Sequence, residues 1–269
     1  MKVETLTVPG ATLRYEVRGN GPVLLLICGG VYDAEGFAGL AEALAEDRTV
    51  VTYDRRGNSR SPLDGPPAVQ SVEEHGDDAY RLLAAVGVTE DEPAEVFGNS
   101  SGAEIALELA ARHPELVRTV VAHEPPAFEL LADAMRWRDL MREVEATFHR
   151  DGWGAAMAVF GEGMAMAGEP AAAPPSPEFM ARMQGNLPFF AGYEVPAFGV
   201  WVPDLDSLRA GPVRVVPAVG AASAGEPPHR VGVELADRLG VEVAQFPGGH
   251  GGHGNPAAFA PRLREVLSD

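Results

Sequence analysis

The sequence Gly-Asn-Ser-Ser-Gly at positions 98–102 constrains the fold of this chain more than any other stretch. Residues 94–97 before it are rich in strand formers, and residues 103–112 after it form a strong helix-forming run. So tight a turn from strand to helix forces its central serine into a strained backbone, and the flanking glycines remove side chains that would clash. We therefore expect Ser100 to project its hydroxyl from the top of a sheet, beside the backbone N–H of Ser101.

Apolar runs and helical patterns alternate along most of the chain. Strands are predicted over residues 3–8, 12–18, 23–27, 49–53, 94–97, 116–122, 213–219 and 241–246, and helices over 35–46, 72–86, 101–112, 229–239 and 256–267. The first two strands alternate apolar and polar residues, as in an antiparallel hairpin with one solvated face. Later strands such as 23–27 are continuous apolar runs, as expected when both faces are covered. The pattern predicts an α/β fold with a mostly parallel central sheet and right-handed crossovers.

The alternation stops between residues 127 and 210. This segment is rich in Pro, Gly and Ala around residues 167–177, and it holds all three tryptophans, seven of the eleven phenylalanines and every methionine except Met1. An apolar, adaptable insertion after a sheet strand suits a lid over an apolar pocket, and a helical subdomain with its own core is compatible with that role. We predict a core domain formed by residues 1–126 and 211–269, and a lid formed by residues 127–210.

Composition excludes several classes of partner. The 269 residues carry 39 acidic and 21 basic side chains, a formal net charge of −18, which argues against nucleic acid and anionic membranes as partners. Cys28 is the one cysteine, so no internal disulfide forms, and a small buried hydrophobe is its expected role. The N-terminus lacks the apolar core of a signal peptide, and no apolar run approaches the roughly 20 residues that span a bilayer. The expected location is the cytoplasm.

Acyl transfer by a serine requires a base, a group that orients the base, and donors for an oxyanion. His250 follows the last predicted strand directly and is the preferred base, with His253 in the same glycine-rich loop as its rival. The loop after strand 213–219 is the usual place for the acid, but its only carboxylate is the late Glu226. Glu124 comes immediately after the preceding strand, beside the serine strand, and is the preferred acid.

The loop after strand 23–27 is expected to supply the second oxyanion donor, alongside the N–H of Ser101. The N–H of Gly30 is preferred, with that of Val31 as the alternative. Apolar and aromatic side chains of this loop and of the insertion are the candidates for contact with substrate. They are Val31, Phe128, Trp153, Phe189, Phe190 and Trp201.

Taken together, these residues resemble the α/β-hydrolase family over nearly the whole chain, and within it most of all the zearalenone lactonases. The matching stretches are Cys28-Gly29-Gly30, the polar loop 54–61, the serine turn 98–102 and Pro247 to His250. Those lactonases carry a Ser-Ser-Gly-Ala turn, matched at 100–103, and place their acid in a His-Glu-x-Pro run, matched at 123–126. They also stack substrate on a lid tryptophan, where this chain has Phe189 and Phe190.

The resemblance implies a serine hydrolase that cleaves a carboxylic ester or lactone of an apolar substrate, with a zearalenone-type macrolactone as the preferred example. Ser100 is the nucleophile, His250 the base and Glu124 its orienting acid. No metal or organic cofactor is expected, and a homodimer stays open. Two alternatives also stay open: a carbon–carbon bond hydrolase with the same triad, and a non-catalytic ligand-binding member of the fold.

Overall fold

The computed structural model describes residues 1–168 and 174–268, and its centre is a sheet of eight strands. The strands are β1 (Lys2–Val8), β2 (Ala11–Arg18), β3 (Val23–Ile27), β4 (Thr49–Tyr53), β5 (Ala94–Asn99), β6 (Val117–His123), β7 (Arg214–Gly220) and β8 (Ala244–Phe246). Their spatial order is β1-β2-β4-β3-β5-β6-β7-β8. The β1–β2 and β2–β4 pairs are antiparallel, and the remaining pairs are parallel. The predicted α/β class is confirmed.

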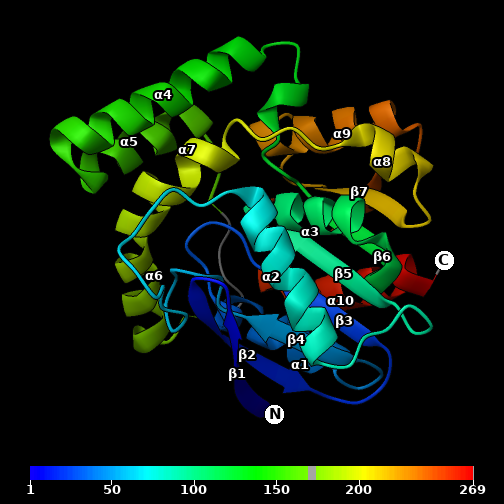
Figure 1. Cartoon of the computed structure of the whole chain (residues 1–269). Helices are drawn as coiled ribbons and strands as arrows, with labels where there is room; N and C mark the ends of the chain where they lie inside the picture. Colours follow the sequence, from blue (N-terminus) through cyan, green and yellow to red (C-terminus); the bar gives the residue numbers. More distant parts are fainter. Residues whose placement is uncertain (169–173, 269) are drawn as a thin grey trace.

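Helices cover both faces of the sheet (Figure 1). Those outside the insertion are α1 (Ala38–Leu44), α2 (Val72–Ala85), α3 (Ser101–Arg112), α9 (Pro227–Leu239) and α10 (Pro256–Ser268). One apolar core packs α1 and α10 against the sheet, and a second packs α2, α3 and α9 against the other face. Leu24 and Leu26 belong to the first core and Leu25 and Ile27 to the second. Because successive strand residues face opposite sides, a strand buried on both faces needs this continuous apolar run.

Most predicted boundaries agree with the structure to within a few residues, and two differ. The region predicted as a helix over residues 35–46 begins with a 3₁₀ turn, η1 (Ala34–Phe37), before α1. The strand predicted over residues 241–246 is short, because Val241 N–H donates to Ala236 O and closes the end of α9. The predicted start of α2 is confirmed, since Ser71 caps it in a capping box.

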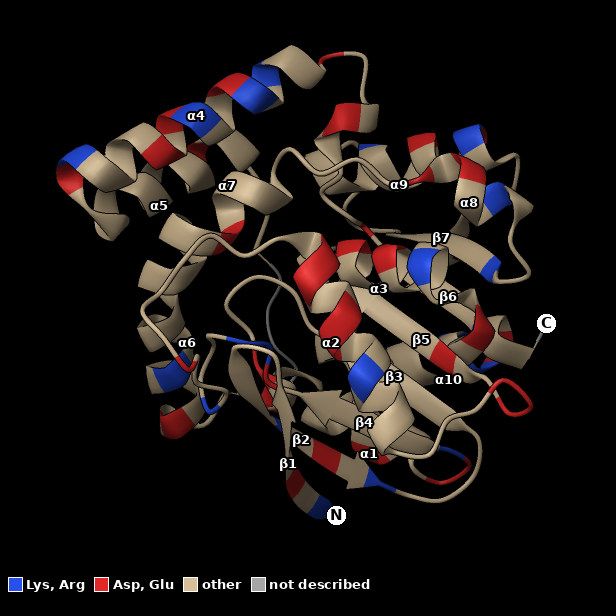
Figure 2. Ribbon diagram, viewed as in Figure 1, with Lys and Arg blue, Asp and Glu red and all other residues tan. Residues whose placement is uncertain are grey.

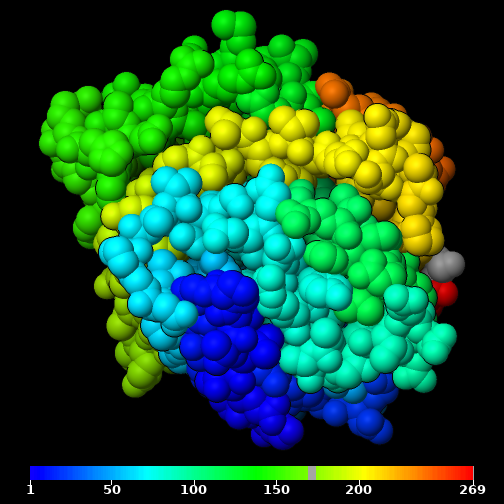
Figure 3. Space-filling model, viewed as in Figure 1, coloured from blue at the N-terminus to red at the C-terminus, as the bar shows by residue number. Residues whose placement is uncertain are grey.

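The insertion, residues 127–210, is mainly helical in its described part. Its elements are η3 (Phe128–Leu130), α4 (Ala134–Asp151), α5 (Trp153–Met164), α6 (Pro177–Phe189), the π-helical turn η4 (Phe190–Glu194), α7 (Val195–Phe198) and α8 (Leu205–Ala210). Figure 1 shows α4 to α7 grouped at one side of the sheet, and α8 contacts α3 and α9. Figure 3 shows the yellow end of the insertion against the cyan loop before α2, where Gln70 N–H donates to Tyr193 O.

Charged residues are distributed along the helices (Figure 2). In Figure 2 both signs alternate along α4, while α2 shows mainly acidic residues. Apolar residues of α4 such as Trp137, Met141 and Val144 are buried, and Trp137 stacks on Phe128 with ring centroids 4.4 Å apart. No helix in the described parts of the chain has the length and apolar character needed to cross a bilayer.

Candidate active site

The turn between β5 and α3 has the strained geometry expected of its sequence. Ser100 has φ 57° and ψ −132°, a region that non-glycine residues rarely adopt. A Cβ at Gly98 would lie 2.2 Å from Gly102 O, and one at Gly102 would lie 2.1 Å from Ile27 O. Ser100 N–H donates to His123 O at 2.9 Å, which ties the turn to the neighbouring strand. The two glycines therefore permit the close packing that holds Ser100 in this conformation.

Glu124 and His250 form a buried pair beside this turn. Glu124 follows β6, is fully buried, and holds Nδ1 of His250 at 2.7 Å from its Oε2. Its other oxygen, Oε1, accepts from Gly220 N–H at 2.8 Å and from the Ser223 hydroxyl. Burial by itself raises the pKa of Glu124, but the hydrogen bonds from His250 and Ser223 and the neighbouring His123 lower it to about 2. The carboxylate is therefore charged at neutral pH and orients the His250 ring.

The other late histidine, His253, has a different environment. Its ring packs edge-on against Phe37, with centroids 4.8 Å apart, and near Tyr32 at 6.5 Å. Burial lowers the pKa of His253 to about 3, so the ring is neutral. The structure thus brings His250, and not His253, to Glu124.

The alternative acid, Glu226, lies at the start of α9. Its Oε1 accepts from Ala167 N–H at 3.0 Å, a contact with the insertion.

Asn99 has a structural role that the sequence did not indicate. Its side-chain amide donates to His250 O at 3.0 Å and contacts His123 Nδ1 at 3.1 Å. Asn99 thereby ties the His250 loop to the end of β5.

The predicted oxyanion donors lie together, but one of them is engaged. Gly30 N–H donates to Ser101 Oγ at 2.9 Å, so its hydrogen bond is directed to a side chain of the same site. The role of Gly30 N–H as an oxyanion donor stays a prediction, and in this conformation that N–H points to Ser101 Oγ. A Cβ at Gly29 would lie 2.8 Å from Ser100 Cβ, so the loop after β3 contacts the serine turn closely.

A cavity of about 280 Å³ opens beside Ser100 and His250. Its described lining residues are Gly29, Gly30, Val31, Tyr32, Asn99, Ser100, Ser101, Pro126, Phe128, Met141, Met157, Phe160, Met164, Met166, Leu187, Phe190, Val195, Phe198, Gly199, His250, Gly251 and His253. The insertion supplies most of the apolar side chains, and no Lys, Arg, Asp or Glu occurs among these described residues. The wall therefore favours uncharged, apolar ligands.

Three of the six predicted substrate contacts line this cavity, namely Val31, Phe128 and Phe190. The other three do not belong to this lining. Trp153 is 43% exposed at the start of α5, and Phe189 packs against Tyr193 with centroids 5.5 Å apart. Trp201 is buried on α3, where its indole N–H donates to Glu108 Oε2 at 3.1 Å, because a buried indole needs an acceptor.

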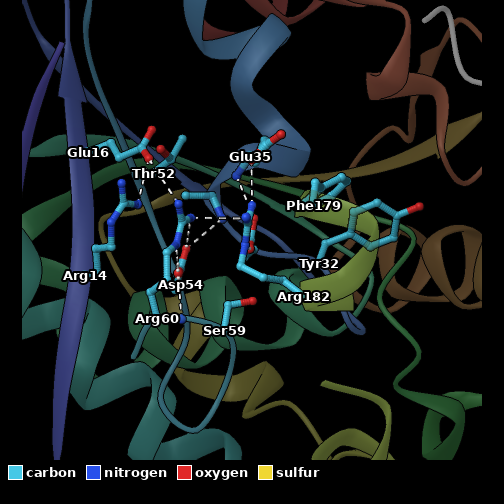
Figure 4. A network of polar contacts seen from close by, with 12 residues as sticks. Arg14, Glu16, Tyr32, Glu35, Thr52, Asp54, Ser59, Arg60, Phe179 and Arg182 are labelled. Atoms are coloured by element: carbon cyan, nitrogen blue, oxygen red, sulfur yellow. Dashed lines mark hydrogen bonds and ion pairs between the residues drawn. The ribbon is translucent and has the colours of Figure 1, made fainter. Parts of the chain in front are cut away.

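Salt bridges attach the insertion to the loop after β3. Arg182 of α6 places its Nε 2.6 Å from Asp33 Oδ2 and its Nη2 2.6 Å from Glu35 Oε2. Figure 4 shows Arg182 pointing toward Glu35, with Asp54 and Arg60 beside them, and Arg60 Nε lies 2.7 Å from Asp54 Oδ2. Asp33 and Asp54 are both fully buried. The loop that carries Gly30 is therefore held between the sheet and α6.

A second buried attachment was not indicated by the sequence. Arg55 Nη2 lies 3.0 Å from Glu194 Oε2 of η4, and both side chains are fully buried or nearly so. Asn186 of α6 donates to Val31 O at 2.9 Å. The sequence does not reveal the pairing of Arg55 with Glu194, because the two residues are 139 positions apart.

Cys28 is buried, and its thiol donates to Tyr32 O at 3.2 Å. Burial raises the pKa of Cys28 to about 12, so the thiolate that a nucleophile requires is disfavoured. Among the described residues, no three or more His, Cys, Asp or Glu side chains are grouped as a metal site.

Comparison with known proteins agrees with this architecture. Residues 22–160 match the family profile described as alpha/beta hydrolase fold. The chain is 37% identical to the uncharacterized hydrolase YraK of Bacillus subtilis (strain 168), over 98% of this chain and 95% of that protein.

Solved structures show the same fold at lower identity. A thermophilic esterase from Thermogutta terrifontis superposes with a TM-score of 0.75 at 19% identity, covering 100% of this chain and 98% of that one. The enol-lactonase from Burkholderia xenovorans LB400 superposes with a TM-score of 0.69 at 19% identity, covering 99% and 100%. At such identities the likeness shows the fold alone. The family profile and the full-length relative establish more than that: the chain belongs to the α/β-hydrolase family.

Proposed function

We propose that this protein is a serine hydrolase that cleaves a carboxylic ester or lactone through an acyl-enzyme on Ser100. The observation that carries the proposal is the convergence of a strained serine and a carboxylate-paired histidine at one apolar cavity. Ser100 and His250 both line that cavity, and His250 Nδ1 lies 2.7 Å from the buried Glu124. Esterases and lactonases among proteins of the same fold support this class of substrate.

The roles of the three residues follow from their chemistry. Glu124, charged at neutral pH, accepts a hydrogen bond from the protonated Nδ1 of His250, which leaves Nε2 unprotonated and able to accept the Ser100 proton. Ser100 Oγ attacks the substrate carbonyl and forms a tetrahedral oxyanion. As this intermediate collapses, the ester C–O bond breaks and His250 protonates the leaving alcohol. Water then gives a proton to His250 and attacks the acyl-enzyme; the bond to Ser100 Oγ breaks, His250 returns the proton to Ser100, and the carboxylic acid is released.

The substrate we propose is uncharged and apolar. The insertion surrounds the cavity with Met and Phe side chains, so residues 127–210 act as the lid, and Met side chains adapt to ligands of different shape. A net charge of −18 disfavours anionic ligands at long range. The matches at Ser100 to Ala103 and at His123 to Pro126 make an aryl macrolactone of the zearalenone type the preferred example. The volume of about 280 Å³ lies at the low end for ligand pockets, which makes smaller aryl esters a necessary comparison.

The test combines labelling with turnover. A fluorophosphonate should label Ser100 of the wild-type protein, and a non-catalytic binding protein should not be labelled. The purified protein is then incubated with p-nitrophenyl esters of graded acyl length and with zearalenone, in which hydrolysis adds the mass of one water. Ser100→Ala should lower kcat by ~10⁶ while the melting temperature stays near that of the wild type. A variant that keeps about a tenth of the activity excludes Ser100 as nucleophile.

A further inference from the structure

The hydroxyl of Ser101 has an unusual set of partners. It accepts from Gly30 N–H at 2.9 Å and from Arg55 Nη1 at 3.4 Å, and Ser101 is 5% exposed. A serine hydroxyl has two acceptor positions and one proton, while a backbone N–H and a guanidinium can only donate. Both acceptor positions of Ser101 Oγ are therefore engaged, and its own proton is left for a further acceptor.

Ser101 also lines the cavity beside Ser100, so a ligand bound there can supply that acceptor. We propose that the Ser101 hydroxyl donates a hydrogen bond to the oxyanion of the intermediate on Ser100, in place of the engaged N–H of Gly30. This inference rests on the proposed function. It makes Ser101 a catalytic residue through its side chain, in addition to its backbone N–H.

Arg55 is the positioning residue of this arrangement. Besides Ser101 Oγ, its guanidinium donates through Nη2 to Gly30 O at 2.5 Å and to Glu194 Oε2 at 3.0 Å. Asn58 Nδ2 donates to the other oxygen of Glu194 at 2.9 Å, so the carboxylate is held from two sides. The guanidinium therefore holds both partners of the donor network, the Gly30 peptide and the Ser101 hydroxyl.

The burial of this network determines its strength. Arg55 is fully buried and Glu194 is 1% exposed, so water does not screen the guanidinium charge. A hydroxyl that accepts from a cation is polarised and becomes a stronger donor toward a developing anion. Glu194 belongs to the π-helical turn of the insertion, a type of element that occurs frequently at functional sites. The insertion thus contributes to the oxyanion site as well as to the apolar wall.

The decisive variant is Ser101→Ala, which removes the hydroxyl and keeps the backbone N–H. We expect kcat on a p-nitrophenyl ester to fall by ~10²–10³, the usual cost of losing one oxyanion donor, with KM changed much less. Ser101→Thr keeps the hydroxyl and should retain most of the activity. Ser207→Ala is the matched control, because Ser207 lies in the first turn of α8, where its hydroxyl donates to the capping residue Asp204, and it does not line the cavity.

A second readout separates catalysis from folding. An aryl boronic acid forms a tetrahedral, anionic adduct with a nucleophilic serine, and its inhibition constant should rise in Ser101→Ala by a factor similar to the loss of kcat. A purely structural role for Ser101 would lower the melting temperature without this selective loss. If the alanine variant fails to fold, Ser101→Cys decides the question, since a thiol keeps the shape but donates weakly.

The outcomes are distinguishable. If Ser101→Ala matches or exceeds the wild-type kcat, the hydroxyl serves only as the acceptor for Gly30 N–H. The inference is then wrong, while the proposed function stands. If the wild type is neither labelled by a fluorophosphonate nor active on any ester or lactone, the proposed function fails and this inference fails with it.

Discussion

Replacing Glu124 by glutamine tests the proposed chemistry most directly. Gly220 N–H and the Ser223 hydroxyl both donate to Oε1 of Glu124, so the single oxygen of the glutamine must remain there. Its NH₂ group then faces Nδ1 of His250, where the carboxylate oxygen lay at 2.7 Å. An amide NH₂ can only donate, so Nδ1 must become the acceptor and the ring proton moves to Nε2. In that tautomer His250 has no free position to accept the Ser100 proton.

The expected magnitude follows from this loss of tautomer together with the loss of charge. The wild-type carboxylate, with a pKa lowered to about 2, is charged at neutral pH and stabilises the His250 imidazolium. Glutamine removes that charge without changing the shape of the side chain. By analogy with the acids of other serine triads, kcat of Glu124→Gln should fall by ~10⁴. The melting temperature should change little, because the hydrogen bonds to Gly220 and Ser223 are kept.

The assay is steady-state hydrolysis of a p-nitrophenyl ester, with Glu226→Gln as the matched control. Glu226 contacts Ala167 N–H and not His250, so its variant should stay within about twofold of the wild-type kcat. Thermal unfolding of both variants confirms that each is folded. A Glu124→Gln variant that keeps about a tenth of wild-type activity would refute the reasoning, and so would an inactive but folded Glu226→Gln variant.

Three further predictions concern buried groups. Arg55→Met leaves Glu194 as an unpaired buried charge and should lower the free energy of unfolding by about 3–5 kcal/mol in denaturant titrations, whereas the double change Arg55→Met/Glu194→Met should recover most of that loss. Burial lowers the pKa of His253 to about 3, so the folded state favours the neutral ring. The stability that this residue contributes is therefore present above pH ~6.5 and is lost as the pH falls toward 3. His253→Phe should flatten that part of the plot of unfolding free energy against pH. Cys28 should resist iodoacetamide until the protein is unfolded, and Cys28→Ala should keep its hydrolytic activity; rapid alkylation of the native protein would contradict the burial of this thiol.

The amino-acid sequence alone was sufficient for the features that depend on local geometry. Strand and helix periodicity predicted the α/β sheet, because side-chain alternation follows directly from backbone conformation. The spacing of Gly98, Ser100 and Gly102 predicted a strained turn, because only glycine fits where the Cβ would meet backbone at just over 2 Å. Parallel strands place their carboxyl ends at one edge, so Ser100 and Glu124 were expected near each other.

Only the tertiary structure decided which side chains meet over long separations in the sequence. It paired His250, rather than His253, with Glu124 across 126 residues. It also left Trp153 exposed, although the aromatic composition of the insertion had suggested that this residue contacts substrate. It also engaged the Gly30 N–H with a neighbouring hydroxyl. Such contacts depend on side-chain direction and on how the insertion packs over the sheet, and neither leaves a periodic signal in the sequence.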